Sequence, residues 1–223
     1  MIDKIVVTEE IKSVCPEFVG LAFEAQITNT PFSEELWEEI EKVGEDYRKR
    51  LTTDSLKDIT SIAATRRIYK LCGKDPSRYR PAAEALIRRI LKGQDLYRID
   101  VAVDLINLAS MVYGYSIGGF DADQIVGNVL SLGIGQKDEP YEGIGRGILN
   151  IEGLPVYRDE VGGIGTPTSD HERTKITLDT THLLVLINGY DGNEENIVRC
   201  GEFIQDLALK YLMATNSKIL IYK

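Results

Sequence analysis

The hydrophobic pattern of the chain changes at Gly114, and this change limits the folds that the chain can adopt. Before this glycine, apolar residues mostly recur with the three- and four-residue spacing of amphipathic helices. After it, short apolar runs are separated by Gly, Asp and Asn, as is typical of strands joined by turns. We therefore predict an α+β fold, in which a helical N-terminal half packs on a mixed, β-rich C-terminal half. No Pro- or Ser-rich linker interrupts the chain, so residues 1–223 are predicted to form a single domain.

Start and stop signals place the individual elements. Ser33 is a good N-cap for the first long helix, because its side chain can accept a hydrogen bond from the first turn. Further helices are predicted over 55–71, 81–93, 99–114 and 193–214. Strands are predicted over 4–7, 18–28, 128–135, 146–153, 154–160, 174–180, 182–190 and 217–223. The stretch 116–128 is predicted to be a loop with a short helix.

Charge is distributed unevenly along the chain. The net charge is −9, which on its own argues against a general nucleic-acid-binding protein. The segment 66–98, however, holds ten basic and three acidic residues, so it carries +7 and the rest of the chain carries −16. Arg88 and Lys92 are four residues apart on one predicted helix face, and Arg78 and Arg80 precede that helix. These four cations can hold the phosphate backbone of a tRNA through salt-sensitive contacts, or they can form a solvated helix face.

Several common kinds of site have no signature in the sequence. His171 and His182 lie outside any metal-binding motif, and the three cysteines are odd in number and widely spaced. We therefore predict no metal and no cofactor.

No apolar run approaches the roughly 18–20 residues that span a bilayer. The N-terminal stretch lacks the basic and apolar regions of a secretory signal. We expect a cytoplasmic protein without a membrane segment.

Glycines cluster in two places. The stretch "VGGIGTPTSDHERTKITLD" (161–179) lacks the lysine and the following helix that a phosphate loop requires. Two interpretations of this stretch remain: a plain turn, or part of a small-molecule pocket that is lined by backbone amides. The second cluster, "GIGRG" (143–147), is predicted to be a hairpin turn, because no βαβ unit surrounds it.

Four segments follow one another in the order found in a known family. They are "YRPAAEALIRRILKG" (79–93), "VDLIN" (103–107), "GGFDADQIVGNVLSL" (118–132) and the glycine stretch 161–179. Together they resemble the B3/B4 tRNA-binding and editing module of the β subunit of phenylalanyl-tRNA synthetase, over about residues 60–190. In that family a VDxxNY-type helix leads to a "HAFD" loop, and a "GIMGG"-like loop is followed by an acid. We expect a free-standing version of this module.

The resemblance implies hydrolysis of a misacylated tRNA, because the family's module removes tyrosine attached to phenylalanine tRNA. It implies that Gly162 and Gly165 are catalytic, with backbone amides facing the developing oxyanion. It also implies that Asn107 and Phe120 help to form the substrate pocket, and that Asp179 accepts a hydrogen bond from the substrate's hydroxyl. The implied partners are the aminoacylated 3′ end of a tRNA and an amino-acid side chain in the pocket.

Two positions depart from the family pattern. The histidine of "HAFD" corresponds to Gly118, a predicted substrate-binding position that here has no side chain, and His171 is the histidine that could replace it. Asp179 stands where the family has glutamate, so the pocket either recognises a different amino acid or uses a bridging water. The alternative to hydrolysis is a non-catalytic module that binds a tRNA or an amino-acid-like ligand.

Overall fold

The fold of the chain, described over residues 2–223 by a computed structural model, is built on two four-stranded sheets. The first sheet has the order β1-β4-β7-β8, with β1 (Lys4–Val7), β4 (Val129–Ile134), β7 (Pro155–Arg158) and β8 (Gly163–Gly165). The second has the order β10-β2-β9-β3, with β10 (Thr215–Tyr222), β2 (Val19–Gln26), β9 (His182–Gly189) and β3 (Ile117–Asp121). β1 and β4 pair in parallel, whereas the other described strand pairs are antiparallel. A hairpin of β5 (Glu142–Gly143) and β6 (Gly147–Ile148) stands apart from both sheets.

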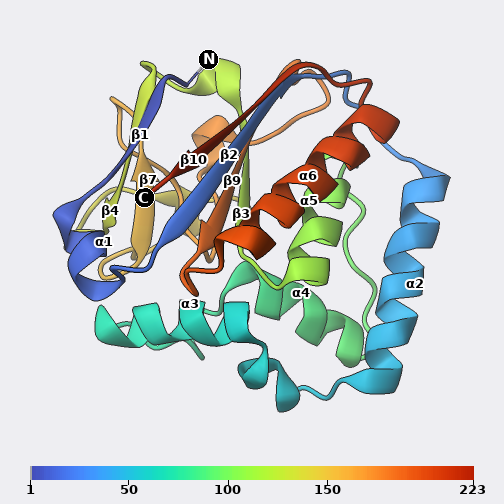
Figure 1. Cartoon of the computed structure of the whole chain (residues 1–223), viewed down its shortest axis with the longest axis horizontal. Helices are drawn as coiled ribbons and strands as arrows, with labels where there is room; N and C mark the ends of the chain where they lie inside the picture. Colours follow the sequence, from blue (N-terminus) through green and yellow to red (C-terminus); the bar gives the residue numbers. More distant parts are fainter. Residues whose placement is uncertain (1) are drawn as a thin grey trace.

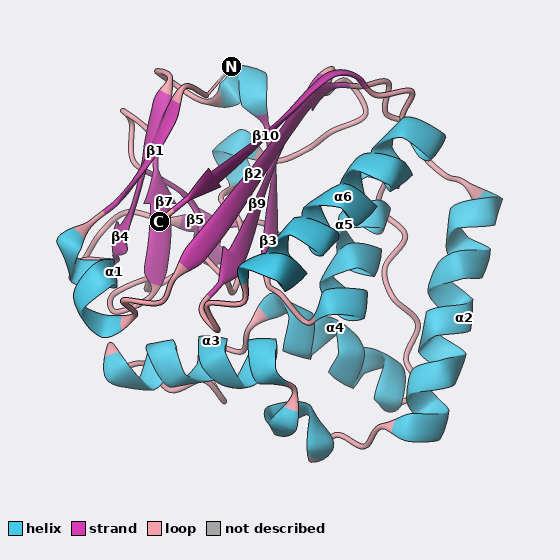
Figure 2. Ribbon diagram, viewed as in Figure 1, coloured by secondary structure: helices cyan, strands magenta, loops and turns pink. Residues whose placement is uncertain are grey.

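Helices form a layer on one side of the second sheet (Figures 1 and 2). The layer consists of α2 (Glu34–Arg50), α4 (Ala82–Leu91), α5 (Val101–Tyr113) and α6 (Glu194–Tyr211). α1 (Glu9–Val14) lies apart from it, against β4, and α3 (Thr60–Leu71) runs below the ends of the strands. α6 contacts β2 and β9, and α5 contacts β3, while α2 and α4 pack outside α5. No helix within residues 2–223 has both the length and the apolar character needed to cross a bilayer.

The central strands β2 and β9 are buried on both faces. Leu21 and Val185 point into the core between this sheet and the helices. Ala22 and Leu184, their neighbours along the chain, point into the core between the two sheets. This alternation follows from the two-residue period of a strand. Elements from both halves of the chain therefore build the same two cores.

The predicted α+β architecture is confirmed, and so are several of its boundaries. The Ser33 hydroxyl accepts a hydrogen bond from the Leu36 N–H (3.3 Å) at the start of α2. α5 starts after Asp100, whose carboxylate accepts from the Val103 N–H (2.9 Å), and it ends at Gly114, which has φ +71°. The "GIGRG" stretch forms the turn of the β5–β6 hairpin, as predicted.

Four predicted elements differ from the structure. The strand predicted over 146–153 is reduced to β6 (Gly147–Ile148), and the residues after it form coil and a turn. The helix over 55–71 is broken, because Ser55–Asp58 forms a 3₁₀ turn before α3. The stretch predicted as a loop contains β3, whose two glycines have little strand propensity and whose pairing with β9 is set by tertiary contacts. The strand predicted over 174–180 is a turn instead. Here the Thr180 hydroxyl accepts a hydrogen bond from the Thr177 N–H (2.9 Å). This side-chain bond replaces the backbone hydrogen bond that a neighbouring strand would provide.

Candidate functional site

An apolar pocket of about 370 Å³ opens between α5, β3 and the segment that follows β8. Its walls are mainly β-branched side chains: Ile99, Val103, Ile106, Ile117, Ile144 and Ile176. Its polar lining consists of Asn107, Asp170 and Lys175. Ile99 and Ile144 are half exposed at the rim, whereas Ile106 is buried at the inner side. An apolar pocket with a few polar groups is the usual form of a small-molecule site.

A tight turn after β8 brings Asp170 into this pocket. The Thr166 hydroxyl accepts from the Ser169 N–H (3.1 Å) and donates to the Ser169 carbonyl (2.9 Å), which reverses the chain. The returning segment then pairs with β8, where Asp170 lies opposite Gly165 and the His171 N–H donates to the Ile164 carbonyl (2.8 Å). The sequence "TPTSD" therefore fixes the position of the acid.

The Asp170 carboxyl is held by one backbone hydrogen bond in largely apolar surroundings. The Gly119 N–H donates to its Oδ2 atom over 3.1 Å. Burial raises the pKa of the Asp170 carboxyl to about 7, and the Gly119 hydrogen bond opposes this rise. Near neutral pH the group thus exists in both its protonated and its ionised form. Such a carboxyl can exchange hydrogen bonds with a ligand hydroxyl in either state.

Two glycines make room for this arrangement. A β-carbon at Gly165 would lie 2.5 Å from Phe120 Cζ and 3.0 Å from Asp170 Oδ1. A β-carbon at Gly118 would lie 2.7 Å and 3.2 Å from the same two atoms. The Phe120 ring itself is fully buried between the sheets. Gly118, Phe120 and Gly165 therefore support the Asp170 carboxyl from behind, and none of the three belongs to the described pocket lining.

A cationic groove of about 430 Å³ runs along α4 beside the pocket. Its charged lining consists of Arg80, Arg88, Arg89, Lys92 and Arg146. Asn107 lines both the groove and the pocket, so the two cavities meet at its side chain. The "TPTSD" turn is tied to the same groove, because the Ala82 N–H at the start of α4 donates to the Pro167 carbonyl (2.8 Å).

The buried Glu84 carboxylate organises the cations at one side of the groove. It forms ion pairs with Arg66 (2.8 Å), Arg80 (3.4 Å) and Arg88 (3.1 Å). One negative charge among three guanidinium groups leaves a net positive cluster. Within residues 2–223, Lys92 and Arg146 have no carboxylate partner. The groove is therefore positive, although the chain as a whole is acidic.

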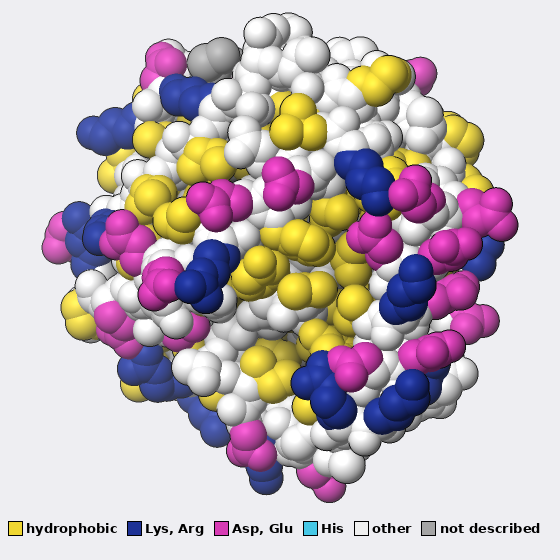
Figure 3. All heavy atoms as spheres, turned by 45° about the vertical axis from the view of Figure 1, so that its right-hand side comes forward, with side chains coloured by type: hydrophobic (Ala, Val, Ile, Leu, Met, Phe, Trp, Pro, Cys, Tyr) yellow, Lys and Arg dark blue, Asp and Glu magenta, His cyan; other side chains and the backbone are white. Residues whose placement is uncertain are grey.

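The surface that α2 and α6 share has a different character. In Figure 3, Lys and Arg side chains on this face are mixed with Asp and Glu side chains around an apolar centre. Mixed charges of this kind cancel at a distance, so this face offers no continuous cationic path.

The structure brings together four of the predicted binding residues. Asn107 lines both cavities, and Arg80, Arg88 and Lys92 line the groove. Arg78 lies outside the described lining, in the exposed loop before α4, with its guanidinium 5.6 Å from the centroid of the Tyr79 ring.

Gly162 and Asp179 lie elsewhere than the sequence suggested. Gly162 is in the turn between β7 and β8, and its N–H donates to Asp159 Oδ1 (3.1 Å), so this amide is occupied within its own turn. Asp179 is exposed in a turn, where its N–H donates to the Thr177 hydroxyl (3.3 Å). The acid in the pocket is Asp170, which precedes Asp179 by nine residues. The misplaced strand over 174–180 is the reason for this difference.

His171 lies outside the described lining of the pocket and of the groove. Its Nδ1 atom accepts a hydrogen bond from the Arg173 N–H (2.9 Å), and its ring packs edge-on against Tyr141 with 4.9 Å between centroids. Both contacts hold the segment after the "TPTSD" turn, which is a structural role.

The fold and the site together define an α+β domain with an acid-bearing apolar pocket beside a cationic groove. The B3/4 domain family model matches residues 64–199, and the chain belongs to this family. The fold is similar to a crystal structure of an N-terminal fragment of the phenylalanyl-tRNA synthetase β-subunit from Pyrococcus horikoshii, with a TM-score of 0.48 and 15% identity. That alignment covers 97% of this chain and 50% of the other, so the chain spans half of that fragment. No curated protein matches the chain in sequence.

Proposed function

We propose that this domain binds the aminoacylated 3′ end of a tRNA and hydrolyses the ester of a wrongly attached amino acid. The observation that carries the proposal is the position of Asn107, which lines both the cationic groove and the apolar pocket. A tRNA end lying in the groove would present its terminal ester at the mouth of the pocket. The groove supplies cations for phosphates, and the pocket supplies apolar volume for a side chain.

Asp170 recognises the polar group of the bound side chain in this proposal. Its carboxyl belongs to the lining of the pocket and is held there by the Gly119 N–H. A tyrosine-like side chain can fill the apolar walls and donate its hydroxyl to the carboxylate. Phenylalanine would leave the carboxyl with the Gly119 N–H alone and without a ligand partner, and such a loss separates two substrates strongly. A tyrosine-like amino acid on phenylalanine tRNA is therefore the proposed substrate.

Asn107 acts on the ester itself. An aminoacyl ester is already activated, so a positioned water and a donor for the developing oxyanion suffice. In the proposed step the water oxygen attacks the ester carbonyl, whose oxygen receives a hydrogen bond from the Asn107 amide. The bond to the ribose oxygen then breaks, and that oxygen takes up a proton from the water. The products are the free amino acid and the uncharged tRNA.

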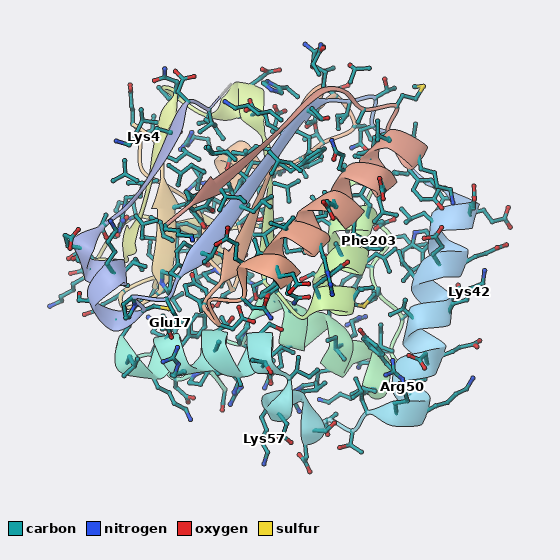
Figure 4. The ribbon with its side chains drawn as sticks, viewed as in Figure 1. Lys4, Glu17, Lys42, Arg50, Lys57 and Phe203 are labelled. Atoms are coloured by element: carbon teal, nitrogen blue, oxygen red, sulfur yellow. The ribbon has the colours of Figure 1, made fainter. Side chains whose placement is uncertain are left out.

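The experiment is a deacylation assay with tyrosyl- and phenylalanyl-esters of phenylalanine tRNA. The wild-type protein should hydrolyse the tyrosyl ester faster, and Asn107→Ala should lower this rate by about 10²-fold, the usual cost of one oxyanion donor. Lys42→Gln, which changes an exposed charge on α2 (Figure 4), should leave the rate unchanged. Rates equal to the uncatalysed ones for all esters would remove the proposal.

A non-catalytic binding module is the second candidate function. Gly118 favours it, because the position that carries a histidine in the family has no side chain here. This candidate predicts saturable, salt-sensitive binding of tRNA together with no hydrolysis of any ester in the same assay.

A further inference from the structure

The tip of the β5–β6 hairpin reaches both cavities. Ile144 belongs to the lining of the apolar pocket, and Arg146, two residues later, belongs to the lining of the groove. Gly145 and Gly147 have φ values of +65° and +66°, which allow the chain to reverse within three residues. The hairpin therefore carries one apolar and one cationic side chain to the place where the two cavities meet.

The base of this hairpin is fixed to the segment that carries Asp170. The Ile144 N–H donates to the Asp170 carbonyl (3.0 Å), and Gly143 forms a bridge with His171. The Tyr141 hydroxyl donates to the Ser169 carbonyl (2.7 Å). These contacts hold the positions of Ile144 and Arg146 relative to the acid, so their placement does not depend on a ligand.

Arg146 differs from the other arginines at the groove in having no internal partner. Arg80 and Arg88 are paired with Glu84, and the Arg89 guanidinium donates to the Asp95 carbonyl. No hydrogen bond or ion pair joins the Arg146 guanidinium to any group within residues 2–223. An exposed arginine without a partner keeps its five donors for a ligand, and its planar fork suits a phosphate.

We propose that the β5–β6 hairpin is a recognition element in which Arg146 binds a backbone phosphate of the tRNA 3′ end while Ile144 covers the aminoacyl group. This assignment rests on the proposed function, and it names the residues that read the two parts of the ligand. The chemical class of the ligand is an aminoacyl group joined to a short oligonucleotide. An amino acid without phosphates would contact Ile144 but not Arg146. An oligonucleotide that carries no aminoacyl group would bind Arg146 but not Ile144.

The test uses two probes that cannot be hydrolysed. One is 3′-tyrosylamino-3′-deoxyadenosine, which has no phosphate. The other carries the same aminoacyl-adenosine at the end of the trinucleotide CCA. Binding of both to the full chain is measured by calorimetry at two salt concentrations, for the wild type, Arg146→Gln, Ile144→Ala and Lys4→Gln. Lys4 is an exposed cation at the edge of the first sheet (Figure 4), which makes its variant a charge-matched control.

The wild-type protein should bind the CCA probe several-fold more tightly than the adenosine probe, with a steeper salt dependence. Arg146→Gln should remove most of this preference and leave the adenosine probe unchanged. Ile144→Ala should weaken both probes by about the same factor, on the order of five-fold, because it removes apolar contact with the shared group. Lys4→Gln should match the wild type. Both side chains are exposed, so circular dichroism should show all variants to be folded.

The proposal is overturned if the wild type binds neither probe, or if Arg146→Gln affects both probes equally or not at all. It is also overturned if Ile144→Ala changes only the CCA probe. Both probes carry an amide in place of the ester, so they measure binding separately from hydrolysis. Binding as expected without ester hydrolysis keeps the hairpin assignment and removes the proposed catalysis. Ester hydrolysis by the wild type, together with an unchanged probe preference in Arg146→Gln, keeps the proposed catalysis and removes the hairpin assignment.

Discussion

The Gly119 N–H donates a hydrogen bond to Asp170 Oδ2 over 3.1 Å, and this contact joins β3 to the segment after β8. The two residues are far apart in sequence, and they meet because β3 pairs with β9 while the "TPTSD" turn sends the chain back along β8. The hydrogen bond fixes the direction of a carboxyl that lies in apolar surroundings.

Asp170 should make stability depend on pH. Its folded-state pKa of about 7 lies above the value of about 3.9 for an unfolded chain, so folding disfavours the ionised form. The contribution of Asp170 to stability is thus greatest below pH 4 and is lost as the pH rises to 7. Asp170→Asn, which keeps an acceptor for Gly119, should be more stable than the wild type at pH 8 by roughly 2–4 kcal/mol. Urea unfolding at pH 5 and pH 8 measures the difference, which should shrink at the lower pH.

The control for this experiment is Asp179→Asn. Asp179 is exposed, so its substitution should change the free energy of unfolding little at either pH. A stability difference for Asp170→Asn that stays constant between pH 5 and pH 8 would contradict the account of its burial.

Gly165→Ala should destabilise the fold. The added methyl group would lie 2.5 Å from Phe120 Cζ, so the ring or strand β8 must shift. Overpacking of this kind costs about 1–3 kcal/mol. Gly44→Ala is the matched control, because its methyl group would meet Ile90 at 3.4 Å and alanine favours the helix α2. Thermal unfolding should show a lower Tm for the first variant and an equal or higher Tm for the second.

Trp37 should report the ionisation of Asp104. The Trp37 Nε1–H donates to Asp104 Oδ2 (2.7 Å), and burial raises the pKa of this carboxyl to about 6. Trp37 is the only tryptophan of the chain, so all tryptophan emission comes from this residue. Emission should change with a midpoint near pH 6, and Asp104→Asn should remove the transition. A midpoint near pH 4, as for a solvated carboxyl, would show that Asp104 is not buried.

Lys92→Gln should weaken tRNA binding through charge alone. Lys92 is exposed in the groove without a carboxylate partner, so its loss removes one cation from the path of the phosphates. The slope of log K against log salt should fall by about one, whatever tRNA is used. Filter binding at several salt concentrations measures the slope. Lys57→Gln, at an exposed lysine before α3 (Figure 4), is the control, and an equal effect of both variants would place the tRNA elsewhere.

Most of the fold could be predicted from the sequence where the pattern was long and locally consistent. The helix cap at Ser33 and the buried strand β9 carry strong local signals, and both are present. β3 could not be predicted, because the glycines in "IGGFD" favour a loop and only pairing with β9 makes the segment a strand. Conversely, "TKITLDT" has the alternation of a strand, but threonine side chains satisfy its backbone locally.

The site was predicted in part for the same reason. Arg88 and Lys92 are four residues apart, so their shared face follows from helical spacing, whereas the approach of Asn107 comes from the packing of α5 on α4. Asp170 was missed because its place depends on the turn at Thr166, and the signal available was the run of Thr, Pro and Ser before the acid. Arg146 was missed because the hairpin's position over α4 follows from tertiary contacts alone.

The most direct test of the proposed site is an NMR titration with 3′-tyrosylamino-3′-deoxyadenosine. Gly119 is bonded to Asp170, and the methyl groups of Ile106 and Ile176 lie in the pocket, so these three residues report on its occupancy. The account predicts saturable shifts of the Gly119 amide and of both isoleucine methyl groups, which Asp170→Asn should weaken. Unchanged signals from these residues, with shifts confined to other surfaces or absent, would contradict it.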